Sequence, residues 1–148
     1  MRLVVQRVSE ASCTVDGAVT GAINTGFMVL VGFCNDDTEE IVVKMANKLK
    51  KLRVFDDADG KMNLSLKDVG GSILSISQFT LYADCAKGNR PSFCGAMKGD
   101  EATKMYDYFN SLLEDEYQVE KGIFGADMKI KLLNDGPVTI ILDSKEIL

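Results

Sequence analysis

The sequence predicts a layered α/β protein in which two amphipathic helices pack on a mostly antiparallel sheet. Segments rich in β-branched residues lie at both ends of the chain and are separated by glycine-bearing turns. Two longer segments repeat apolar residues at helical spacing. No GxGxxG motif follows the first strand, which argues against a nucleotide-binding Rossmann fold. The 148 residues, 46% of them hydrophobic, contain no linker or internal repeat, so we expect one domain over residues 1–148.

The first third of the chain predicts three strands. Residues 2–8 form the first, and residues 13–15 and 18–23 flank Asp16-Gly17, a dipeptide favoured in type I′ hairpin turns. Residues 27–33 predict a buried strand, because the apolar stretch around them has nine residues and a membrane-spanning helix needs about 20. The N-terminal MRLVVQRVSE also lacks the zones of a signal peptide. We therefore expect a cytoplasmic location and no membrane association.

The first helix is expected where the pattern changes after residue 36. Asp37 is followed three residues later by Glu40, which resembles a helix N-terminus. Over about 14 residues the apolar positions recur at helical spacing, namely Ile41, Val42, Met45, Leu49 and Leu52. A short strand at residues 53–55 then runs into an acidic turn at residues 56–60, whose spacing does not fit a calcium-binding EF-hand loop.

The second half predicts a central strand at residues 72–81, a loop at residues 87–98, a second helix and three further strands. Asp100 is the expected helix cap. The apolar stripe of this helix comprises Ala102, Met105, Tyr106, Phe109, Leu112 and Leu113. The strands are expected at residues 117–123, 127–133 and 138–142, and the segment between the last two is by itself typical of a hairpin turn.

The composition limits the chemistry that the chain can perform. It has no histidine, which excludes a Ser-His-Asp or Cys-His catalytic group and an imidazole-dependent zinc site. Catalysis must use other side chains, backbone groups or the substrate, and we expect neither a metal nor a cofactor. The net charge of −5 argues against promiscuous nucleic-acid binding. The four cysteines follow no framework spacing, so each is interpreted as a small apolar filler.

The central strand offers one candidate site. Alternation places Gln78 and Thr80 on the same face, at the point where a buried strand leaves the core. Side chains and backbone N–H groups can reach a ligand from such a position. An ordinary strand end is the alternative interpretation.

Basic residues offer a second candidate. Lys44, Lys48 and Lys51 share one face of the first helix by their spacing. With Lys87 and Arg90 from the later loop they would form a phosphate-binding patch. A solvated helix face is the commoner meaning of such a run.

Two short motifs carry a resemblance to a known family. SQFTL at residues 77–81 and NDGPVT at residues 134–139 resemble the paired SQxxL and NxGPxT motifs of the D-aminoacyl-tRNA deacylases. The opening MRLVVQRV, GKMN at residues 60–63 and GNRPSF at residues 88–93 agree with the same family. Because both motifs occur in the right order at the right separation, chance similarity is a poor explanation.

The resemblance implies a fold, a reaction and a set of partners. Members of this family are cytosolic homodimers that hydrolyse the ester between a D-amino acid, or glycine, and the 3′-terminal adenosine of tRNA. The implied fold is a three-layer α/β/β arrangement of mostly antiparallel sheets with two main helices. The implied role is chiral proofreading in translation quality control, which spares L-aminoacyl-tRNA. Expected partners are aminoacylated tRNA and a second copy of the chain, with no DNA and no membrane.

The resemblance also assigns roles to the NDGPVT motif. In the family the Gly-Pro bond is cis, and its two carbonyls reach into the active site of the other subunit. That role falls to Gly136 and Pro137, with Asn134 and Thr139 beside them in the substrate-binding motif. A rigid carbonyl pair can bind the α-ammonium and block the direction of an L side chain. Arg7 is expected to brace this loop from the first strand.

The mechanism is expected to involve residues Ser77, Gln78, Phe79 and Thr80. Thr80 as a nucleophile is one interpretation, but no base is available to activate it. The other interpretation, which the family favours, uses the adenosine 2′-hydroxyl or a water that it orients, with backbone N–H groups near residues 77–79 stabilising the oxyanion and Gln78 positioning the substrate.

The remaining substrate contacts are expectations of the same kind. Phe124 and Met128 are candidates for holding the terminal adenine. The basic patch would bind the phosphates of the acceptor stem. Two rival functions remain open at this point, a thiol hydrolase using Cys85 or Cys94 and a non-catalytic dimer that binds RNA or protein.

Overall fold

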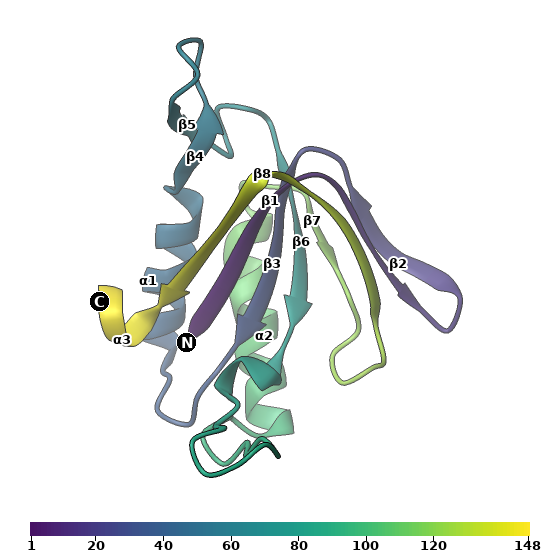
Figure 1. The fold of residues 1–148 in the computed structure, drawn as a ribbon, viewed down its shortest axis with the longest axis vertical. Coiled ribbons are helices and arrows are strands. Elements are labelled where there is room, and N and C mark those ends of the chain that lie inside the picture. The colour runs from purple at the N-terminus through teal and green to yellow at the C-terminus, as the bar shows by residue number, and fades with distance from the viewer.

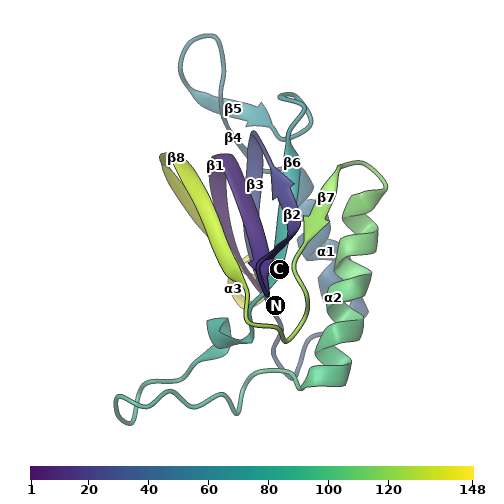
Figure 2. The same ribbon diagram turned by 90° about the vertical axis from the view of Figure 1, so that its right-hand side faces the viewer.

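The computed structural model describes residues 1–148 and consists of a curved sheet with two helices on one face (Figures 1 and 2). The strands of the sheet are β1 (Arg2–Val15), β2 (Ala18–Ile23), β3 (Gly26–Gly32), β6 (Ser72–Ser77), β7 (Val119–Lys121) and β8 (Lys129–Asp143). The two long helices are α1 (Glu39–Lys50) and α2 (Gly99–Glu114). A separate hairpin joins β4 (Arg53–Asp56) to β5 (Met62–Ser65), a 3₁₀ turn η1 spans Phe79–Tyr82, and α3 (Ser144–Ile147) ends the chain.

Strand β1 belongs to two layers of the molecule. Its first part pairs with β3, its second part pairs with β2, and β8 pairs with both parts. The second part bends so that β2 lies over β6 and β7. A core of 22 buried residues fills the space between sheet and helices, and a second core of seven lies between the two parts of the sheet. The predicted three-layer α/β/β arrangement is therefore confirmed.

Most strand pairs are antiparallel, as predicted, while β3 with β6 and β6 with β7 are parallel. The hairpin turn between β1 and β2 is also confirmed. Asp16 and Gly17 have φ angles of 49° and 79°, and two successive positive φ values define the type I′ turn. The predicted strands at residues 2–8 and 13–15 are one continuous strand, because β8 pairs along nearly the whole of it.

Both long helices occur where the apolar spacing predicts them, but their N-terminal caps differ. Thr38 caps α1, since its hydroxyl accepts the Ile41 N–H, whereas the carboxylate of Asp37 is buried against the chain's terminal ammonium and the Cys34 N–H. A carboxylate with those partners cannot also cap the helix. The cap position of α2 is Lys98, and the predicted cap, Asp100, lies within the first turn. None of the helices combines the length and apolar character needed to cross a bilayer.

The predicted strand at residues 72–81 is wrong at its C-terminal end. Strand β6 stops at Ser77, and the chain turns into η1. Its parallel partner β3 ends at Gly32, and the Gln78 N–H makes the last bond to it, 2.7 Å from the Val31 carbonyl oxygen. Because no strand continues beyond that point, Gln78 and Thr80 do not share a strand face.

The hairpin-turn interpretation of residues 134–139 is also wrong. A hairpin would require the flanking segments to pair with each other, but both pair with β1 and belong to the single strand β8. Asn134 pairs with Val8 and Thr139 with Gln6, so the residues between them bulge out as a loop. The predicted strand at residues 117–123 shortens to β7, and the acidic turn at residues 56–60 joins β4 to the unpredicted strand β5.

Candidate active site

A pocket of about 290 Å³ lies at the C-terminal end of β6. Its lining includes Ser77, Gln78 and Phe79, and also Phe124 and Met128 from the segment between β7 and β8. The structure thus brings together five of the residues that the sequence singles out. Ile76, Gly125, Ala126, Asp127 and Ile130 complete the lining.

The polar groups beside this pocket are few. The Gln78 side-chain amide donates to the Thr80 hydroxyl at 2.5 Å, and Thr80 is exposed outside the pocket lining. The Gln78 backbone N–H already donates a hydrogen bond to the Val31 carbonyl oxygen. Of the three N–H groups predicted to face an oxyanion, those of Ser77 and Phe79 therefore remain as candidates.

Arg2 fixes the segment that follows Gln78. Its Nη1 donates to the Leu81 carbonyl at 2.5 Å, and its guanidinium lies 4.8 Å from the centre of the Tyr82 ring. Nε and Nη2 donate to Asp143 Oδ2 at 2.9 and 2.7 Å. Burial is the largest single influence on the pKa of Asp143 and raises it, but the hydrogen bonds from Arg2 and the Lys145 N–H, together with the nearby positive charges, outweigh burial and hold this pKa below its usual value. Neither residue was predicted to matter, because no local pattern connects positions 141 apart.

Tyr106 of α2 contacts both segments that line the pocket. Its hydroxyl donates to the Ser75 carbonyl at 2.7 Å, two residues before Ser77, and its ring centre lies 6.0 Å from that of Phe124. Burial raises the pKa of the Tyr106 phenol, so the group stays protonated and able to donate. The sequence assigned Tyr106 to the apolar stripe of α2, and it is indeed buried there.

The NDGPVT motif forms a second, separate feature, the Gly-Pro loop, which we define as residues 134–139. The Gly136-Pro137 peptide bond is cis, and both residues are exposed. Asn134 closes the base of the loop, because its Oδ1 accepts the Val138 N–H at 2.7 Å and its amide donates to Gln6, Val138 and Thr139. The side chains of Asn134 and Thr139 thus bond within the loop.

Arg7 braces the Gly-Pro loop from β1. Its Nε donates to the Asp135 carbonyl at 2.8 Å and its Nη1 to the Val54 carbonyl at 2.7 Å. The side chain is 9% exposed and lies 3.4 Å from the Asp56 carboxylate. The loop is therefore tied both to its own strand and to the β4–β5 hairpin.

The pocket and the Gly-Pro loop lie apart within one chain. Gln78 bonds to Val31, which pairs with Leu3, whereas the loop lies opposite Gln6 to Val8 of β1. At about 3.3 Å per residue this places them roughly 10–16 Å apart along the strands. Strands β1 and β3 also separate β8 from β6 across the sheet. One chain alone does not form a cavity with both motifs.

Comparison with known proteins decides the family. The family described as D-Tyr-tRNA(Tyr) deacylase matches residues 4–143. The chain belongs to this family. It is a hydrolase, a D-aminoacyl-tRNA deacylase, and acts in proofreading during translation. The resemblance inferred from the two motifs is confirmed.

Two solved structures resemble the deacylase over almost their whole length. One, described as "c-Myc DNA Unwinding Element Binding Protein", is 42% identical with a TM-score of 0.91, and the match covers 97% of this chain and 98% of that one. The other, described as "Structural Analysis of a probable eukaryotic D-amino acid tRNA deacylase", is 18% identical with a TM-score of 0.82, covering 95% and 97%. At 18% identity the second likeness concerns the fold alone.

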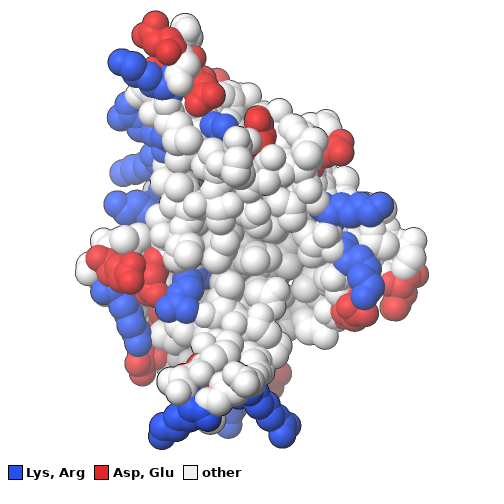
Figure 3. All heavy atoms as spheres, in the orientation of Figure 1, with Lys and Arg blue, Asp and Glu red and all other residues white.

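The predicted basic patch of the deacylase is divided in the structure. Lys44, Lys48 and Lys51 lie on α1, where Lys44 pairs with Glu40 at 2.7 Å. Lys87 and Arg90 lie in the segment between η1 and α2. Figure 3 shows basic side chains along α1 and the β4–β5 hairpin, and a separate basic group at the lower end of the molecule. The structure does not join the five residues into one surface.

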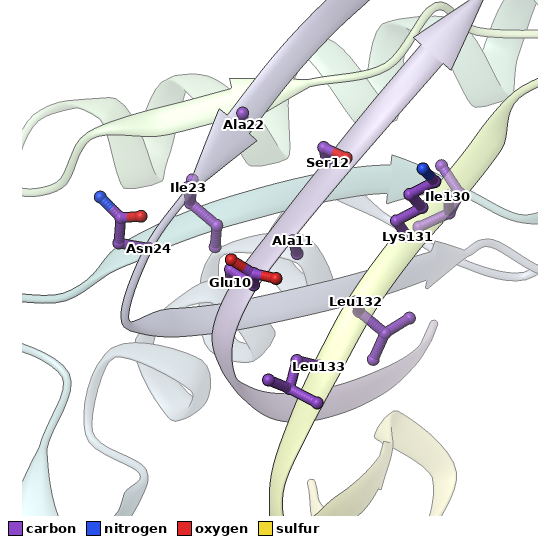
Figure 4. A pocket seen from close by; sticks show the side chains of 10 residues that line it. All are labelled: Glu10, Ala11, Ser12, Ala22, Ile23, Asn24, Ile130, Lys131, Leu132 and Leu133. Atoms are coloured by element: carbon purple, nitrogen blue, oxygen red, sulfur yellow. The ribbon is translucent and has the colours of Figure 1, made fainter.

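Two other features of the deacylase lie outside the pocket. A larger hollow of about 710 Å³ between β1, β2 and β8 contains none of the predicted site residues, and Figure 4 shows its lining. Of the cysteines, Cys13 and Cys34 are buried as predicted, whereas Cys85 and Cys94 are exposed, so the filler interpretation is wrong for these two. Both lie in the segment between η1 and α2, which has few apolar neighbours to bury them.

Proposed function

We propose that this deacylase hydrolyses the ester between a D-amino acid and the 3′-terminal adenosine of tRNA, accepts the glycyl ester, and spares L-aminoacyl-tRNA. The observation that carries the proposal is the pocket at the end of β6, which Ser77, Gln78 and Phe79 line together with Phe124 and Met128. An apolar pocket with a few polar groups suits a nucleoside bearing an ester. We assign the adenine to Phe124 and Met128 and the ester to Ser77, Gln78 and Phe79.

The active enzyme is proposed to be a homodimer in which Gly136 and Pro137 of one protomer complete the pocket of the other. The support is geometric, since the Gly-Pro loop is exposed, braced and distant from the pocket of its own chain. On β8 near this loop, Leu133 and Ile141 are 57% and 62% exposed, which is unusual for large apolar residues in a strand. A two-fold axis would bury such residues against their equivalents and place both loops at once.

The chiral filter is proposed to act by exclusion. The carbonyl groups of Gly136 and Pro137 accept hydrogen bonds from the α-ammonium and occupy the space that an L side chain needs. A D side chain points away from them. Glycine has no side chain to exclude, so its ester enters as well.

Ester cleavage is proposed to proceed without a side-chain nucleophile. The Thr80 hydroxyl is bonded to the Gln78 amide, which cannot take up its proton. The adenosine 2′-hydroxyl, or a water that it orients, instead assists attack of water on the ester carbonyl. The N–H groups of Ser77 and Phe79 stabilise the oxyanion, and collapse releases the amino acid and the free 3′-hydroxyl of tRNA.

The direct test uses one tRNA charged separately with D-tyrosine, L-tyrosine and glycine. We expect fast release of the D-amino acid and of glycine, with the L ester decaying at the uncatalysed rate. Equal release of the D and L esters would contradict the chiral filter. Acceleration of none of the three would favour a non-catalytic binding protein.

A second candidate function follows from the name of the 42% identical relative, which refers to binding of a DNA element. Addition of duplex DNA to the deacylation assay separates the two. We expect no inhibition by DNA at concentrations where uncharged tRNA competes. A thiol hydrolase is tested in the same assay with Cys85→Ser and Cys94→Ser, both outside the pocket lining, which we expect to retain kcat.

A further inference from the structure

The segment between η1 and α2 forms a projecting arm, which we define as residues 83–96 (Figure 2). Asp84 and Ser92 pair through two backbone hydrogen bonds of 2.8 and 2.9 Å, which fold the arm back on itself. Its root is fastened to the body, since the side chain of Asn35 donates to the Cys94 carbonyl at 2.9 Å. The arm therefore has a defined shape although almost all of its residues are exposed.

The arm continues one wall of the pocket. The ring of Phe93 meets the ring of Phe79 edge to face, with the centres 5.0 Å apart, and Phe79 lines the pocket. The two residues are 37% and 54% exposed. Exposed aromatic rings beside a nucleoside pocket offer stacking surfaces to unpaired bases.

The arm also carries charge suited to a nucleic-acid backbone. Lys87 and Arg90 lie near its tip, and neither takes part in any of the ion pairs of the structure. The carboxylate of Asp84, the only acidic group of the arm, accepts the Ala86 N–H at 2.9 Å. Cations next to stacking surfaces are the combination found in proteins that bind single-stranded nucleic acids.

The other basic group lies on a different side of the molecule. The helices cover one face of the sheet, whereas the pocket lining includes Ile76 of the second core, on the other face, and Met128 and Ile130, which pack against that core. Lys48 and Lys51 on α1 are therefore separated from the pocket by the sheet. A strand whose 3′ end is held beside Gln78 meets the arm first.

We infer that the arm binds the single-stranded 3′ end of the tRNA, with Phe93 stacking on a base next to the terminal adenosine and with Lys87 and Arg90 binding the phosphates. The lysines of α1 take no part. This inference rests on the proposed function, because it requires the terminal adenosine to occupy the pocket.

The test compares two variants with the same change of charge, Lys87→Ala/Arg90→Ala on the arm and Lys48→Ala/Lys51→Ala on α1. Each is assayed with D-tyrosyl-tRNA and with 3′-D-tyrosyl-adenosine, which has no phosphates to bind. For the arm variant we expect KM for the tRNA to rise about tenfold or more with little change in kcat. The slope of log affinity against log salt should become shallower by about 1.4, because each single-strand phosphate that a cation neutralises contributes about 0.7 to it. Cleavage of the adenosine ester should not change.

Phe93 is tested separately, because its removal abolishes stacking without changing charge. Phe93→Ala should raise KM for D-tyrosyl-tRNA roughly 5- to 150-fold, the usual range for one stacked base. Phe93→Tyr keeps an aromatic face and should restore binding. If Phe93→Tyr fails to restore tRNA binding, the ring of Phe93 acts by packing within the protein rather than by stacking on a base.

Three outcomes would overturn the inference. One is a rise of KM in the α1 variant and none in the arm variant. Another is equal loss of activity on the tRNA and on the adenosine ester, which would mean that the arm shapes the pocket. If the wild-type chain cleaves neither ester, the proposed function itself fails, and this inference fails with it.

Discussion

The Gly-Pro loop and the pocket rim are both departures from regular strands, but they are held in different ways. The loop is fixed by neighbours that surround it, since Asn134 bonds across its base and Arg7 holds Asp135. The rim, residues 78–82, has an exposed turn that is fastened from the far ends of the chain, through Arg2 and Asp143. The loop is thus rigid by itself, whereas the rim depends on residues remote in sequence.

Gly136→Ala should give the largest effect, because it deforms the feature that we describe as rigid. A Cβ at this position would lie 2.7 Å from Val138 Cγ2 and 2.8 Å from Val138 N, and the φ of 145° favours glycine. We expect kcat/KM for the D ester to fall about a hundredfold, as for misplacement of about 1 Å near a reacting group. Gly99→Ala, with open space around its Cβ, is the matched control. Normal activity of Gly136→Ala would mean that the loop is not rigid.

Arg7→Lys should give the next largest effect. Lysine keeps the charge but cannot reach Asp135 and Val54 with a planar fork. We expect the free energy of unfolding to fall by about 1–3 kcal/mol, since carbonyl groups lose a buried donor. We expect kcat/KM to fall about tenfold, measured on the D ester. A drop in the free energy of unfolding with full activity would show that the loop keeps its shape without this brace.

Asp143→Asn tests whether the ion pair between Arg2 and Asp143, which holds the rim, makes a pH-dependent contribution to stability. Because the folded pKa of Asp143 is lowered, its pairing with Arg2 stabilises the fold above the usual carboxyl value of 3.8 and is lost as the pH falls below it. At pH 7 we expect the variant to be less stable by on the order of 1–2 kcal/mol. Urea unfolding at pH 7 and at pH 3 should show this difference shrinking. The exposed Asp107→Asn serves as control, and a pH-independent difference would contradict the pairing.

Tyr106→Phe tests how far the pocket depends on support from helix α2. It removes the hydroxyl bonded to Ser75 and keeps the ring beside Phe124. We expect the free energy of unfolding to fall by about 0.5–1.5 kcal/mol. If the hydroxyl positions the strand end, kcat should fall more than the change in stability explains, while KM for the tRNA stays constant. Tyr106→Leu, which also removes the ring, should raise KM as well.

Thr80→Ala should give the smallest effect. Its hydroxyl meets the Gln78 amide rather than a base, so we expect most of the activity to remain. Single-turnover cleavage of D-tyrosyl-tRNA is the measurement. A decrease of about a thousandfold, of the size seen when a catalytic group is removed, would instead make Thr80 a participant in the chemistry.

The sequence predicts best those features that depend on local apolar spacing and on short motifs. The stripe from Ala102 to Leu113 gives helix α2. The structure also brings Ser77, Gln78 and Phe79 into one pocket with Phe124 and Met128, while the roles of these residues stay predictions. The local sequence does not indicate which strand pairs with which. The end of β6 depends on where β3 stops, and the continuity of β8 depends on its pairing with β1.

The remaining misses have the same physical origin. Arg2 and Asp143 are 141 positions apart, and nothing near either of them signals the other. The five basic residues form one group in the sequence analysis because the spacing of charges does not indicate on which side of the sheet an element lies. Asp37 resembles a cap until the fold supplies it with a buried ammonium.

Strand β1 holds both regions, because Arg2 at its start fastens the pocket rim and Arg7 in its middle braces the Gly-Pro loop. Side chains alternate along a strand, and β1 buries Leu3, Val5 and Arg7 on one face while Arg2 belongs to the other. Insertion or deletion of a single residue between these arginines would turn one of them to the wrong face. A change of one residue in the length of this short stretch is therefore incompatible with holding both regions at once.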